Sequence, residues 1–218
     1  MRYNLHTHSI ENNPDVIAIV NCYPYESIDN ILYFSTGIHP WYINEQEIDS
    51  HLAIIEQRLQ MPTCLALGEC GLDKRIETPL AIQQEVFEKQ LLLAKQYKKP
   101  VILHCVAAYQ EVIEIKHRLE MDVPMVIHGF SKNEQVAAQL LSNGFYLSFG
   151  KYLLRNPELS SVLASVPSDK FFLETDSLEE GIDAVYEKAA LAQNIKMQDL
   201  KDIIQTNFKT VFRNGGVD

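Results

Sequence analysis

Five of the seven histidines in this sequence stand at or just beyond the ends of apolar runs. They are His6, His8, His39, His104 and His128. His6 and His8 are two residues apart, so an extended strand would project both rings to the same side, where they can converge on one ion. His-x-His also occurs by chance and is a weak signal alone. The other two, His51 and His117, fall in helical patterns and fit a packing or solvated role better.

Two carboxylates occupy comparable positions, Glu69 after the fourth apolar run and Asp176 after the eighth. Mixed imidazole and carboxylate ligands suit Zn, Mn, Fe or Ni better than an all-oxygen Ca or Mg site, although Mg stays among the candidates. The sequence therefore predicts two divalent metal ions of open identity. The predicted ligands are His6, His8, Glu69, His104, His128 and Asp176.

Eight apolar runs bounded by turn residues indicate strands. They are Tyr3–Leu5, Val16–Asn21, Tyr33–Thr36, Cys64–Gly68, Val101–His104, Met125–Ile127, Phe145–Phe149 and Phe171–Glu174. Apolar residues three and four apart indicate helices between them, as in 48–59, 82–94 and 108–119. Thr78 and Pro79 are expected to begin one helix, and Ser131 with Glu134 is expected to cap another.

Strands that alternate with helices predict a parallel sheet covered by helices, and a count of eight favours a closed barrel over a doubly wound open sheet. The first crossovers look stunted, because residues 9–15 are too few for a normal helix. The predicted fold class is thus α/β, a trimmed TIM (β/α)8 barrel. We expect one domain over residues 1–218.

Barrel geometry assigns the six predicted ligands to two ions. His6, His8 and Asp176 would lie on the neighbouring first and eighth strands, and His104 and His128 on the neighbouring fifth and sixth. Glu69, on the fourth strand, is predicted to bridge the two ions. Such a pair would share a water, lower its pKa and hold the attacking and leaving oxygens.

Composition limits the partners. The net charge of -10 disfavours a wide electrostatic contact with DNA, RNA or an anionic membrane. No apolar run approaches a membrane span, and two early histidines stand where a secretory signal would be apolar. Four scattered cysteines are too few for a disulfide scaffold. We expect a cytoplasmic protein with buried, reduced thiols, no membrane contact and no obligate protein partner.

Six blocks of the sequence resemble the TatD family of metal-dependent hydrolases, in the amidohydrolase-like barrel group. They are Asn4–His8, Gly37–Trp41, Leu67–Asp73, Ile102–Cys105, Ile127–Ser131 and Leu173–Asp176. The blocks follow the family's order over essentially the whole chain. The Gly-Glu-Cys-Gly-Leu-Asp and Glu-Thr-Asp blocks together are quite specific.

The resemblance implies a hydrolase of phosphodiester bonds, in a family with divalent-cation-dependent deoxyribonucleases among its members. It maps the same six residues onto the metal ligands and makes Asp176 and Glu69 the predicted catalytic residues. Asp176 would accept the proton of the attacking water, and His39 would line the substrate side. Asp73 is expected to orient a ligand.

Departures from the family pattern reduce the number of predicted substrate contacts. Asn4 stands where Asp is usual, Ile10 where an acidic residue often follows, and Val106 where Arg is frequent. The loop after Asp176 also lacks its longer Pro- and Arg-bearing form. We therefore expect exonuclease-like attack on single-stranded or end-accessible DNA, or on a small phosphodiester, rather than a grip along duplex DNA.

Three further side chains are candidates for substrate binding. Lys132 and Lys151 follow the sixth and seventh strands and could meet a phosphate at the rim, or be solvated surface charge. Trp41, with Tyr42, could form an aromatic platform for a base or sugar, or cover a short loop.

Other functions remain open at this point. A PHP-type phosphoesterase shares the Leu-His-Thr-His opening, but no histidine follows His128 here. An amidohydrolase-like enzyme could cleave amides, lactones or phosphotriesters with the same ions, although many carry a carboxylated Lys where Glu69 stands. A catalytically silent binding barrel would be expected to have lost a ligand, and all six are present.

Overall fold

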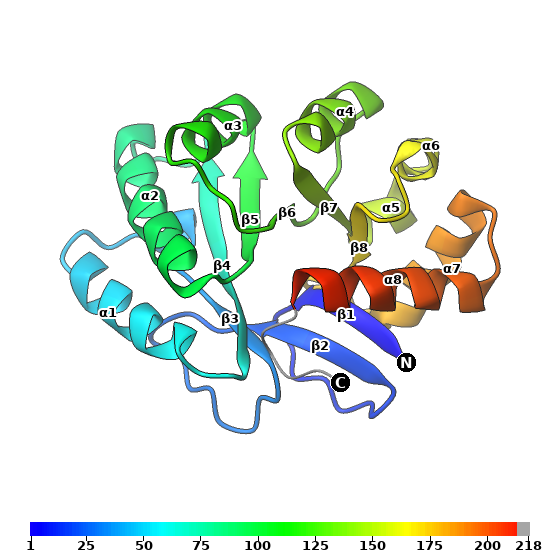
Figure 1. Cartoon of the computed structure of the whole chain (residues 1–218), viewed down its shortest axis with the longest axis horizontal. Coiled ribbons are helices and arrows are strands. Elements are labelled where there is room, and N and C mark those ends of the chain that lie inside the picture. Colours follow the sequence, from blue (N-terminus) through cyan, green and yellow to red (C-terminus); the bar gives the residue numbers. More distant parts are fainter. Residues whose placement is uncertain (213–218) are drawn as a thin grey trace. The chain divides into compact units, whose positions relative to one another are not determined.

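The computed structural model describes residues 1–212. Over these residues eight strands form a single sheet in the order β1 to β8, with helices between most of them (Figure 1). The pairs β1 with β2, β3 with β4, β4 with β5 and β7 with β8 are all parallel. The predicted (β/α)8 fold class is therefore confirmed.

Two compact units make up the described chain. The first unit comprises residues 1–20 with 126–212, and the second comprises residues 21–125. The single domain expected from the sequence stays a prediction.

The first unit contains most of five strands and five helices. The strands are β1 (Arg2–Thr7), β2 (Val16–Asn21), β6 (Met125–Ile127), β7 (Phe145–Phe149) and β8 (Phe171–Leu173). The helices are α4 (Glu134–Ser142), α5 (Lys151–Arg155), α6 (Glu158–Ser165), α7 (Gly181–Gln193) and α8 (Met197–Val211). Helix α8 buries Leu200, Ile204 and Phe208, which recur every four residues, so one apolar face covers the sheet. The Phe208 ring lies 4.6 Å from that of Tyr3 on β1.

The second unit contains three strands, three α-helices and a 3-10 helix. They are β3 (Phe34–Thr36), η1 (Pro40–Tyr42), α1 (Ile48–Leu59), β4 (Cys64–Asp73), α2 (Leu80–Tyr97), β5 (Val101–Val106) and α3 (Tyr109–Arg118). All ten residues of β4 are buried, because β3 and β5 pair with its edges and α2 packs against it. Glu69 is therefore carried by the most enclosed strand of this unit.

The structure corrects several predicted boundaries. Strand β4 continues to Asp73 and β5 to Val106, so Glu69 and His104 lie inside strands rather than at their ends. A register shift between Leu67 and Cys70 accompanies the continuation of β4 beyond its predicted end at Gly68.

Two predicted helix starts also differ from the structure. Helix α2 begins at Leu80, with Pro79 at the N-cap position instead of Thr78. Helix α4 is capped by Asn133, whose side chain accepts from the Val136 amide, and not by Ser131. Asn is as good a cap as Ser, so composition alone could not choose between them.

The stunted crossovers are confirmed, since the structure has no helix between β1 and β2 or between β2 and β3. The four cysteines are buried and form no disulfide. Burial raises the pKa of the Cys22 thiol to about 11 and that of Cys64 to about 12. Within residues 1–212, no helix is both long enough and apolar enough to cross a membrane.

Candidate metal centre

Strand β1 and the turn after β8 bring three predicted ligands together in the first unit. The His8 Nε2 atom lies 3.4 Å from Asp176 Oδ1, and the His6 Nε2 atom lies 3.9 Å from the same oxygen. One ligand atom from each of the three residues lies within 4.8 Å of the others. Hydrogen bonds from the Asp176 amide to the His6 carbonyl and from the His8 amide to the Asp176 carbonyl fix the two segments side by side. The structure thus brings these three residues together, and their role as ligands of one ion stays a prediction.

Lys151, the first residue of α5, contacts the Asp176 carboxylate. Its Nζ atom lies 2.6 Å from Asp176 Oδ2. Burial raises the pKa of Asp176, but hydrogen bonds from His8 and Lys151 and the charges of two more histidines outweigh it, so the pKa lies well below its usual range. Asp176 is thus ionised at neutral pH. Lys151 is a partner of this carboxylate rather than solvated surface charge.

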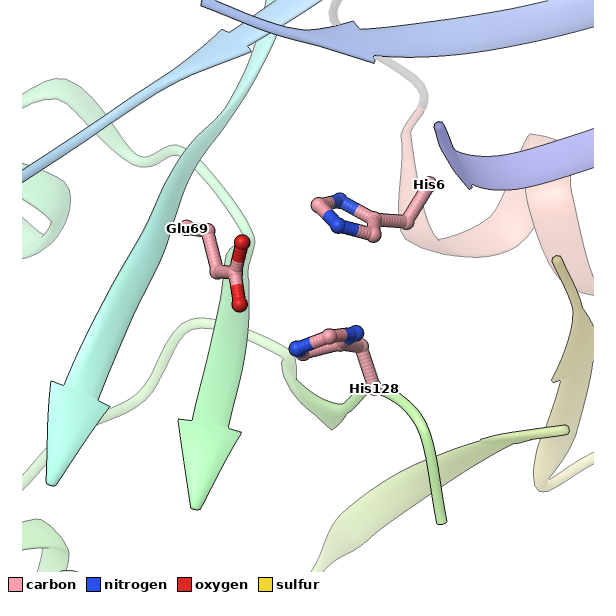
Figure 2. A group of neighbouring side chains, drawn as sticks. All are labelled: His6, Glu69 and His128. Carbon is pink, nitrogen blue, oxygen red and sulfur yellow. The ribbon is translucent and has the colours of Figure 1, made fainter. Parts of the chain in front are cut away.

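His128 follows β6 and lies beside His6, with ring centroids 4.5 Å apart (Figure 2). Its Nδ1 atom lies 3.4 Å from Oε1 of Glu174, and the same oxygen accepts from the Gly129 amide at 2.6 Å. The Glu174 side chain is fully buried. A carboxylate on one ring nitrogen fixes the imidazole and leaves Nε2 for a ligand. Sequence reasoning missed this role, although Glu174 and Asp176 are two residues apart after one strand.

A second group of metal-ligand type lies in the second unit, around the Glu69 side chain that β4 carries (Figure 2). Glu69 Oε1 lies 3.1 Å from His104 Nδ1 and 3.2 Å from His39 Nε2. One ligand atom from each of these residues lies within 4.8 Å of the others. The Glu69 amide donates to Asn21 Oδ1 at 2.7 Å, which fixes the backbone of this ligand.

Asp73 holds the other side of His104, as predicted. Its Oδ2 atom lies 3.3 Å from His104 Nε2 and accepts from Trp41 Nε1 at 2.8 Å. Oδ1 accepts from the Arg75 amide. Burial raises the pKa of Asp73, but the bonds from Trp41, Arg75 and His104 lower it below the usual value. Trp41 therefore has a positioning role that sequence reasoning did not identify.

His39 is better suited to donate a hydrogen bond than to bind a metal ion. Its Nδ1 atom accepts from the Trp41 amide at 3.1 Å and so carries no proton. The ring proton must then sit on Nε2, which faces Glu69 Oε1. A nitrogen that keeps its proton cannot be a metal ligand. The expected place of His39 on the substrate side stays a prediction.

Two other predicted residues have different surroundings. Lys132 lines a pocket of about 610 Å³ with side chains around the starts of α4 and α6, and no candidate ligand lines that pocket. Asn4 is bound to Thr175, accepting from its amide at 3.0 Å and donating to its Oγ1 at 2.8 Å. Through these two bonds the Asn4 side chain tethers the segment before Asp176.

The residues present fit divalent metal ions. In the first unit His6, His8 and Asp176, and in the second unit Glu69 and His104, offer imidazole nitrogens and carboxylate oxygens within reach of one another. Such mixed sets are typical of Zn, Mn, Fe or Ni sites. The described residues show carboxylates behind His104 and His128, the arrangement that usually orients metal-binding imidazoles.

Comparisons with known proteins place the chain among metal-dependent hydrolases and nucleases of one family. The model of the TatD related DNase family matches residues 7–213. An uncharacterized metal-dependent hydrolase of Haemophilus influenzae is 32% identical over 68% of this chain and 60% of its own length. A protein of Edwardsiella piscicida named 3'-5' ssDNA/RNA exonuclease TatD is 30% identical over 78% of this chain and 65% of its own. The matched segment thus spans about 60 to 65% of these curated relatives.

Among solved structures, the TatD homologue YJJV of Escherichia coli superposes with a TM-score of 0.82. It is 22% identical and the match covers 97% of this chain and 98% of that one, which shows a common fold. A TatD family hydrolase of Entamoeba histolytica gives a TM-score of 0.78. With the family model matching nearly its whole length, the chain belongs to the TatD related DNase family.

Proposed function

We propose that this protein is a divalent-metal-dependent hydrolase that cleaves phosphodiester bonds at the ends of single-stranded nucleic acid or in small phosphodiesters. The observation that carries the proposal is the set of imidazole and carboxylate groups in each unit, in a chain whose residues 7–213 match the TatD related DNase family. Relatives named 3'-5' ssDNA/RNA exonuclease TatD support the choice of substrate. We also propose a cytoplasmic location, in keeping with four buried cysteines that form no disulfide.

The proposed ligands are those predicted from the sequence. His6, His8 and Asp176 would hold one ion, and His104 and His128 the other, with Glu69 bridging them. The (β/α)8 fold supports this, because such barrels place the carboxyl ends of all strands at one end. Bound there, two ions would supply Lewis-acid stabilisation of the phosphate oxygens and lower the pKa of the attacking water.

The protein's own groups would divide the remaining work. Asp176 is ionised at neutral pH and so is able to accept the proton of the attacking water. His39 would donate from Nε2 to a substrate oxygen, because its tautomer is fixed by the Trp41 amide. Asp73 and Glu174 would keep the His104 and His128 rings in place.

A metal-supplemented substrate screen tests the proposal. The purified protein should bind two equivalents of Zn or Mn and cleave single-stranded DNA ends or a small phosphodiester, and a chelator should abolish turnover. His128→Ala should lose metal, whereas His117→Ala on α3 serves as the matched control and should bind as the unmodified protein does. Cleavage of amides or lactones with no phosphodiester activity would replace the proposal with the amidohydrolase-like alternative.

The salt dependence of DNA binding tests the expectation that the protein contacts only one or two phosphates. Lys151 is engaged by Asp176 and the net charge is -10, so few cations are left to follow a duplex backbone. Binding of a catalytically silenced variant to duplex DNA should show a slope of log affinity against log salt shallower than about -2, since each neutralised phosphate contributes about -0.9. A slope of about -5 or steeper would reveal an extended basic surface and a dedicated duplex nuclease.

A further inference from the structure

Four aromatic side chains of the second unit gather in what we call the aromatic row, Tyr23, Tyr25, Trp41 and Tyr42. Three of them are unusually open to solvent, Tyr25 at 57%, Trp41 at 55% and Tyr42 at 46% of their full exposure. Single exposed aromatics are ordinary on protein surfaces, but a contiguous group of them marks a binding surface.

The three tyrosine rings of the aromatic row follow one another in contact, and the His39 ring joins them to Trp41. Tyr23 stacks on Tyr25 with centroids 5.6 Å apart, and Tyr42 meets the Tyr23 ring edge-on at 5.1 Å. At the other end, the His39 ring lies 5.6 Å from Tyr42 and 5.0 Å from Trp41. The row therefore leads outward from the residues around Glu69.

Hydrogen bonds hold the row in this arrangement. The Arg58 guanidinium donates to the Tyr23 carbonyl at 2.9 Å and to the Glu26 carbonyl at 2.6 Å, which fixes the loop after β2. Trp41 is tied through Nε1 to Asp73. A surface that is already ordered loses little conformational entropy when a ligand binds.

The neighbours of the row indicate what it would bind. The loop carries the carboxylates of Glu26 and Asp29, which outnumber the Arg58 guanidinium bound to its carbonyls, so we expect the affinity to come from the ring faces. Nucleobases in a single strand offer their π-faces to aromatic side chains, whereas duplex bases already stack on each other. The loop itself exists because the crossover between β2 and β3 has no helix.

We propose that the aromatic row binds unpaired bases of a single-stranded nucleic acid by stacking, next to the group that would bind the reacting phosphate. The proposal deepens the function proposed above and rests on it. Stacking is tolerant of sequence, because every base has a π-face. It predicts affinity for single strands that depends on bases more than on charge.

Fluorescence of Trp41, the one tryptophan of the chain, reports on binding directly. With chelator present to prevent cleavage, a thymidine oligonucleotide should quench it. Tyr25→Leu and Tyr42→Leu should each weaken binding by about 5-fold or more, the lower end for loss of one stacked base. Tyr25→Phe and Tyr42→Phe keep the ring and should bind as the unmodified protein does.

An oligonucleotide of the same length and charge with abasic positions provides the second arm. It should bind weakly to all variants, and Tyr25→Leu should make no further difference. Equal affinity for abasic and normal strands, or no effect of either leucine variant, would overturn stacking by the row. Leu191→Ala, on the exposed face of α7, controls for loss of surface apolar area. Metal-dependent cleavage of a small phosphodiester by the unmodified protein tests the proposed function separately.

Discussion

Asp176→Asn is expected to fold normally and to lose on the order of 10² to 10⁴ in turnover. The amide keeps the shape of the carboxylate and can still accept the hydrogen bond from Lys151, but it cannot take a proton from water. The variant's turnover on single-stranded DNA and on a small phosphodiester should be compared with that of the unmodified protein at equal metal content, measured on the same samples.

Matched measurements separate catalysis from folding and metal loading. Asp169→Asn removes a carboxylate that is 71% exposed and should leave turnover unchanged. Circular dichroism and thermal unfolding should show that Asp176→Asn is folded. Turnover close to the unmodified value in a metal-loaded, folded Asp176→Asn protein would remove Asp176 from the role of base.

Gly71→Ala is expected to destabilise the protein by about 3 kcal/mol or more, from backbone strain and overpacking together. Gly71 has a φ of +143° and pairs with His104 on β5, and an added Cβ would come within 1.9 Å of the His104 carbonyl oxygen. Neither strand can yield without shifting Glu69 or His104. The midpoint of urea unfolding should fall sharply, and metal binding should weaken with it.

Gly181→Ala is the matched control for this substitution. Gly181 also has a positive φ, +77°, but an added Cβ meets nothing within 4 Å. Gly181→Ala should lower the free energy of unfolding only by the penalty for a left-handed backbone, about 1 to 2 kcal/mol. Similar unfolding midpoints for the two variants would mean that the β4 and β5 backbones can separate at this point, contrary to the close packing described here.

The carboxylates behind the histidines depend on the fold as much as the predicted ligands do. Glu174 reaches His128 from 46 residues along the chain, and Asp73 reaches His104 from 31. Glu174 is fully buried and Asp73 nearly so, which makes their positions depend on the surrounding strands. A site that lost either carboxylate would keep its ligands but not their orientation.

The sequence by itself determined the order of elements and the identity of the predicted ligand set. A strand or helix that buries one face shows this locally, in the spacing of its apolar residues. For this reason β2, β6, β7 and α1 match their predicted bounds. The expectation that His6 and His8 project to the same side also follows from strand geometry alone. Family resemblance then supplied the chemistry, and the family match agrees with it.

The tertiary structure decided which side chains meet. The contacts of Lys151 with Asp176, of Glu174 with His128 and of Trp41 with Asp73 join segments distant in sequence. They depend on strand register, side-chain rotamers and the register shift that carries β4 on to Asp73, none of which leaves a local periodic signal. For the same reason, only the folded chain shows Tyr23 and Tyr25 beside Tyr42.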